Sequence, residues 1–85
     1  MSQLPQTTAH VQITRRSWQE GALEGEVSAN GWVWYFCWHF RGGNLRVEPS
    51  VGRALICDPL RRFLEKSDYL LEPGSNYSFV IRSRL

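Results

Sequence analysis

Cys37 and His39 are the residues whose types and spacing most directly suggest chemistry, because side chains two positions apart on a strand project from the same face. A neighbouring histidine can activate a cysteine nucleophile by lowering the pKa of its thiol. The strand pairing derived below places Glu24 and Glu48 beside Cys37, and nearby carboxylates raise the pKa of a thiol. We therefore expect Cys37 to be unreactive and the protein not to be an enzyme.

The same side chains raise the question of a metal site. Zinc sites usually contain paired ligands such as Cys-x2-Cys, and the sequence contains no such pair. Its glycines also form no phosphate-binding pattern of the Gly-x-Gly-x-x-Gly or Walker type. The sequence therefore predicts neither a metal nor a cofactor.

These residues belong to a segment that alternates with period two, which predicts a strand. One face of this strand carries only aromatic residues, here called the aromatic stripe: Trp32, Trp34, Phe36, Trp38 and Phe40. A strand of this length spans about 30 Å, roughly twice the length of a helix with as many residues. We therefore expect the stripe near Trp32 or Phe40 to be covered by sheet curvature or by a second chain.

The turn before the strand sets its first pairing. Asn30-Gly31 is typical of a two-residue type I′ turn, because both residues tolerate positive φ. This turn predicts that Val27 faces Trp34 and that Gly25 faces Phe36. A glycine at that position would let the sheet bend and the large ring fold over it.

The turn after the strand sets the second pairing. Gly42-Gly43 as a two-residue turn predicts that Trp38 faces Val47. Both turns place apolar residues on the same side of the sheet. This agreement predicts a three-stranded meander over about residues 22–48.

Further strands are predicted by alternation in "AHVQITRR" and "NYSFVIRSRL". Between them, Asp58 as an N-cap and Pro59 at the first helical position predict a helix from about Asp58 to Lys66. The expected fold is α+β: an antiparallel sheet of four to five strands in ββββαβ order, with one short helix packed on one face. The predicted core comprises Trp34, Phe36, Trp38, Leu60, Phe63, Leu64, Phe79 and Ile81.

Length and composition limit the remaining choices. With 85 residues the chain is expected to form a flexible tail over residues 1–8 and a single domain over residues 9–85. No apolar run is long enough for a membrane-spanning helix, and the start lacks the features of a signal peptide. The two cysteines form no disulfide framework, so we expect reduced thiols and a cytoplasmic location.

The outer face of the sheet, opposite the helix, holds the candidate binding residues Tyr35, His39, Arg46, Arg82 and Arg84. Arginines beside an exposed aromatic residue suit single-stranded nucleic acid, where bases stack and phosphates form ion pairs. Glu24, Glu26 and Glu48 share this face and would repel phosphate, and the formal net charge is only +2. Nucleic-acid binding is therefore the alternative hypothesis, and a protein partner is favoured.

A second candidate surface lies at the ends of the aromatic stripe. Trp18, in the loop between the first two strands, has no obvious position in the core. Together with Trp32 and Phe40 it forms a possible interface, because large aromatic residues dominate the binding energy at many interfaces. The occupant would be an unidentified protein partner or a second copy of the chain.

Three segments carry a resemblance to a known family: "ITRRSWQEGALEGEV", "VEPSVGRAL" and "LEPGSNYSFVIRSRL". They resemble a family of short cyanobacterial proteins of uncharacterised function, and the likeness extends over nearly the whole chain. The resemblance implies a cyanobacterial, cytoplasmic protein connected with photosynthetic physiology. It transfers no functional residues. The hypothesis is therefore a small non-enzymatic interaction or regulatory module, for example an accessory factor of a larger photosynthesis-related complex.

Overall fold

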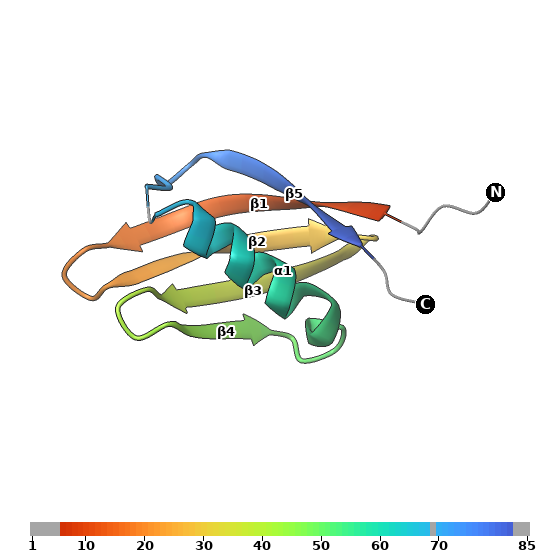
Figure 1. The fold of residues 1–85 in the computed structure, drawn as a ribbon, viewed down its shortest axis with the longest axis horizontal. Coiled ribbons are helices and arrows are strands. Elements are labelled where there is room, and N and C mark those ends of the chain that lie inside the picture. The colour runs from red at the N-terminus through yellow and green to blue at the C-terminus, as the bar shows by residue number, and fades with distance from the viewer. Residues whose placement is uncertain (1–5, 69, 83–85) are drawn as a thin grey trace.

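The computed structural model describes residues 6–68 and 70–82. The described residues form β1 (Gln6–Ser17), β2 (Ala22–Ala29), β3 (Trp32–His39), β4 (Asn44–Glu48), α1 (Arg53–Lys66) and β5 (Asn76–Arg82). The strands form one antiparallel sheet in the order β4-β3-β2-β1-β5. Figure 1 shows α1 lying obliquely across one face of this sheet. The predicted α+β fold and its ββββαβ order are confirmed.

The β2–β3 hairpin has the predicted turn and pairing. Asn30 has a φ of 54° and Gly31 a φ of 78°, as a type I′ turn requires. Gly25 pairs with Phe36, and the other predicted pairs across this hairpin are also present. The local chemistry of two turn residues therefore determines the register of the whole hairpin.

The β3–β4 hairpin differs from the prediction by two residues. Phe36 instead of Trp38 pairs with Val47, because the turn comprises residues 40–43 and not Gly42-Gly43 alone. The backbone N–H of Gly43 donates to the carbonyl of His39 at 2.7 Å, so the turn closes at His39 and Phe40 lies within the turn. A shift of two residues preserves the period of a strand, and the same faces remain inside.

The helix begins earlier than predicted. α1 starts at Arg53, after the N-cap Gly52 with a φ of 75°, so Asp58 is not the N-cap and Pro59 lies inside the helix. Ile56 is fully buried one turn before Leu60 and extends the apolar stripe of the helix towards its N-terminus. This burial accounts for a helical start that the sequence signals at Asp58 and Pro59 do not indicate.

The core lies between α1 and the sheet. The aromatic stripe is buried from Trp34 to Phe40, whereas Trp32 is 49% exposed. The other predicted core residues also lie in this cluster, with Phe63 and Phe79 partly buried against it. Sheet and helix together therefore cover most of the stripe and leave the Trp32 end open.

β1 begins within the segment expected to be a tail. Its first residue, Gln6, pairs with Arg82 at the end of β5. The sequence could not indicate this start, because it depends on the pairing of the first and last strands. The start of the predicted tail, residues 1–5, lies outside the described residues.

Candidate functional site

The open end of the aromatic stripe is built around Trp34. The indole N–H of Trp34 donates to the carbonyl of Val51 at 2.8 Å, which fixes the segment before α1 against β3. Gly52 lies so close that a Cβ at this position would be 2.9 Å from Cζ2 of Trp34. The ring of Trp32 stacks on that of Trp34, with centroids 6.4 Å apart and an interplanar angle of 22°.

Apolar side chains are exposed on the segments that meet here. Trp32 is 49% exposed, Val51 58% and Leu55, in the first turn of α1, 38%. We call these three residues the Trp32 patch. Clustered apolar surface of this kind is characteristic of interaction sites, whereas single exposed apolar residues are not.

The other end of the stripe is closed. Phe40 is buried, and the ring of Trp18 meets it edge-on at a centroid distance of 5.5 Å. The guanidinium of Arg16 lies 4.8 Å from the centre of the Trp18 ring, and the side chain of Arg41 donates to the Trp18 carbonyl. Of the three predicted interface residues, Phe40 therefore belongs to the core, Trp18 covers Phe40 with one side and is itself 53% exposed, and Trp32 is uncovered.

The outer face brings together only part of the predicted binding residues. Tyr35 and His39 lie on β3, and Arg46 lies on the neighbouring β4. Arg82 lies on β5, at the opposite edge of the sheet and at least about 19 Å from Arg46, because neighbouring strands are about 4.8 Å apart. Arg84 lies outside the described residues.

Cys37 and His39 are close, with 3.4 Å between Sγ and Nε2. Burial is the main cause that raises the pKa of the Cys37 thiol, and the charge of Glu24 adds to it. The shifted β3–β4 register places Arg46 opposite Cys37, where the prediction had placed Glu48. Arg46 opposes the increase in the pKa of Cys37. The pKa is therefore raised by burial and Glu24, and not by Glu24 and Glu48 as predicted.

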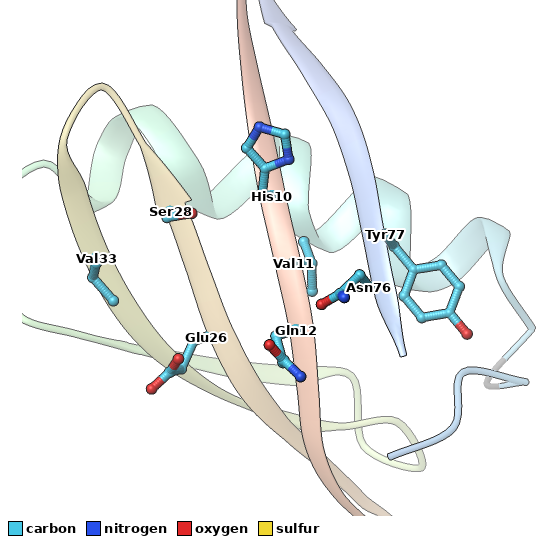
Figure 2. A pocket seen from close by; sticks show the side chains of 8 residues that line it. All are labelled: His10, Val11, Gln12, Glu26, Ser28, Val33, Asn76 and Tyr77. Carbon is cyan, nitrogen blue, oxygen red and sulfur yellow. The ribbon is translucent and has the colours of Figure 1, made fainter. Parts of the chain in front are cut away.

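Two hollows are lined mainly by residues of the outer face. The larger, of about 460 Å³, is shown in Figure 2 and is lined by His10, Val11, Gln12, Glu26, Ser28, Val33, Asn76 and Tyr77. The smaller, of about 230 Å³, is lined by Glu24, Tyr35, Phe36, Cys37, Arg46 and Glu48. The sequence did not indicate the larger hollow, because this hollow forms only when β5 pairs with β1. The alternating polar residues of these two strands were the available signal.

Within residues 6–68 and 70–82, no group of three or more His, Cys, Asp or Glu side chains is arranged to hold a metal ion. The helix of the described chain is too short and too polar to cross a membrane. The candidate functional surfaces of the described residues are thus the half-exposed Trp32 patch and the polar outer face of the sheet.

Comparison with protein families matches residues 5–84 to the family described as "Protein of unknown function (DUF3146)". Comparison with curated proteins gives no match. Comparison with solved structures also gives none. Because the family match spans nearly the entire sequence, the chain belongs to DUF3146, a family of proteins of unknown function.

Proposed function

We propose that this protein is a small non-enzymatic interaction module and that the Trp32 patch anchors a protein partner. The observation that carries the proposal is the position of Trp32, which continues the aromatic stacking of the core and is still half exposed. A rigid, supported tryptophan can be buried by a partner at little cost in side-chain entropy, which is typical of binding hot spots. Val51 and Leu55 extend the apolar contact around it.

A non-catalytic role is supported by the raised pKa of Cys37, which keeps this thiol protonated at neutral pH. The resemblance to short cyanobacterial proteins supports a cytoplasmic setting and an accessory role in a larger photosynthesis-related complex. In such a role the chain contributes a binding surface and leaves the chemistry to its partner.

Affinity capture from the source organism tests the proposal. Tagged wild-type protein and the Trp32→Ser variant are compared, with Val80→Ser as the control because Val80 is also about half exposed but lies on β5. We expect a defined partner with the wild type and the control, and its loss with Trp32→Ser. The contact should persist at high salt, since it is apolar.

Equal capture by wild type and Trp32→Ser, with both variants folded, would show that the Trp32 patch is not the anchor. Loss of the partner at moderate salt would instead indicate a charged contact elsewhere on the surface.

Nucleic-acid binding is the second candidate, supported by Arg46 beside Tyr35 and His39. Binding of a single-stranded oligonucleotide through phosphates should weaken steeply with salt and with Arg46→Gln. Glu24, Glu26 and Glu48 lie on the same face and oppose such binding. We therefore expect no measurable binding at physiological salt.

A further inference from the structure

Tyr35 stands between two carboxylates on the outer face. It is 59% exposed, and it pairs with Glu26 of β2 on one side and with Glu48 of β4 on the other. Cross-strand neighbours in register lie about 5 Å apart, so both carboxylates are within reach of a group placed on the Tyr35 ring. An exposed aromatic ring with an acidic residue on each side has the electrostatic character that attracts a cation.

No ion pair within residues 6–68 and 70–82 neutralises these carboxylates. Arg15 forms ion pairs with Glu20 at 2.9 Å and with Glu24 at 2.7 Å. In the described part of the chain, by contrast, neither Glu26 nor Glu48 forms an ion pair or a side-chain hydrogen bond. The carboxylates beside Tyr35 are thus available to an external partner.

The lining of the larger hollow includes Glu26 and the next two residues of the same row, Gln12 and Asn76. Gln12 pairs with Glu26 on one side and with Asn76 on the other, and Figure 2 shows these three side chains on neighbouring strands with α1 behind the sheet. The side-chain amides of Gln12 and Asn76 make no hydrogen bond within residues 6–68 and 70–82. Each amide offers both donors and an acceptor, which match the polar groups of a peptide backbone.

We propose that this row binds an extended peptide segment of a partner protein, with an arginine side chain of the segment seated on Tyr35 between Glu26 and Glu48. A guanidinium group stacks on an aromatic ring and carries five N–H donors, so it can satisfy both carboxylates at once. The backbone next to the arginine lies over the hollow, where Gln12 and Asn76 hydrogen-bond to it. This site lies on the outer face, so it does not depend on the proposed partner at the Trp32 patch.

The charges on the face favour a cationic over an anionic ligand. A nucleic acid placed on Tyr35 would bring phosphates close to Glu26 and Glu48. The nearby cation of the smaller hollow is Arg46, which lies opposite Cys37 and two residues along β4 from Glu48. The two carboxylates therefore favour a peptide that contains arginine over a nucleic acid.

Nuclear magnetic resonance of the 15N-labelled full chain tests the proposal. The probe is the peptide acetyl-Gly-Arg-Gly-amide at low ionic strength, and a matched peptide carries citrulline, which keeps the shape of arginine without its charge. We expect millimolar binding of the arginine peptide, with shifts at the amides of Tyr35, Glu26, Glu48 and Gln12. The citrulline peptide should bind at least about five-fold more weakly.

Single substitutions measure how much each side chain contributes to binding of the arginine peptide. Glu26→Gln and Glu48→Gln should each weaken binding by about two- to five-fold, and Tyr35→Leu by a similar factor. Glu65→Gln is the control, because Glu65 is an exposed carboxylate on α1 and should not affect binding. Retained chemical-shift dispersion shows that each variant is folded.

Equal binding of the citrulline peptide, equal losses in Glu65→Gln and Glu26→Gln, or shifts confined to other surfaces would overturn the proposal. Shifts centred on Arg46 with an oligonucleotide and none with the peptide would assign the face to nucleic acid. A failure of partner capture through Trp32 would leave these outcomes unchanged.

Discussion

At the scale of single residues, Gly25 explains how the large ring of Phe36 fits over the sheet. A Cβ at Gly25 would lie 2.3 Å from the carbonyl oxygen of Gln12 and 2.8 Å from Cε2 of Phe36. The absence of a side chain therefore creates the space that the ring fills. This contact follows from the predicted pairing of the two residues across the β2–β3 hairpin.

Gly25→Ala should therefore destabilise the protein by about 1–3 kcal/mol, because the added methyl group overpacks a filled position. Urea denaturation followed by circular dichroism measures the change. Gly42→Ala is the matched control, since a Cβ there meets no atom within 4 Å, and we expect a change within about 0.5 kcal/mol. Equal stability of the two variants would mean that Phe36 does not occupy the space above Gly25.

The Cys37 thiol permits a prediction on pH dependence. Burial and Glu24 raise its pKa, so alkylation in a Cys57→Ser background should be slow at neutral pH and speed up only in alkaline solution. Glu24→Gln removes a negative charge and should lower the pKa, which moves the midpoint of the pH–rate profile to lower pH. Rapid alkylation of the native thiol at neutral pH would contradict both the assigned surroundings and the non-enzymatic role.

At the scale of elements, the sequence predicted what depends on local chemistry. Asn30-Gly31 specifies its turn directly, and the β2–β3 register follows from it. The second hairpin differs from the prediction by two residues because its turn closes between His39 and Gly43, and Gly42-Gly43 alone does not specify this longer turn. Residue patterns thus determined the faces of both hairpins but the register of only one.

The start of α1 shows the same limit. Asp58 and Pro59 resemble a helix N-terminus, but the helix begins at Arg53. The burial of Ile56 in the core accounts for this earlier start, and it depends on the tertiary structure. In this structure Pro59 therefore occupies an interior position, where it cannot donate a backbone hydrogen bond and its ring crowds the preceding turn.

Replacement of Pro59 tests this placement. Pro59→Ala should stabilise the protein by about 1–3 kcal/mol, because alanine restores the missing donor inside the helix. At the first helical position, by contrast, the substitution would give no gain. Pro73→Ala, in the loop before β5, should slightly destabilise the chain through the entropy of the unfolded state. Denaturation midpoints decide between the two helix starts, and a loss of stability in Pro59→Ala would contradict the interior position.

At the scale of the whole molecule, the two sides of the sheet present different surfaces. The helix-covered side is apolar and ends in the Trp32 patch, whereas the outer face carries the polar row through Tyr35. The length of the aromatic stripe predicted that the helix would not cover the part near Trp32 or Phe40. It could not indicate which end, because the cover of Phe40 comes from Trp18 in a separate loop. The polar row also required the pairing of β1 with β5, which brings distant segments together.

The size of the Trp32 patch leads to a prediction on oligomeric state. A stable dimer buries about 800 Å² on each partner, and three partly exposed side chains are too few to provide that area. We therefore expect sedimentation at the mass of one chain, 9.9 kDa, at tens of micromolar protein. Trp32→Ser should leave both this mass and the thermal midpoint nearly unchanged, since Trp34 beneath it is already buried. Sedimentation at twice the chain mass, reversed by Trp32→Ser but not by Val80→Ser, would instead identify the occupant of the Trp32 patch as a second copy of the chain.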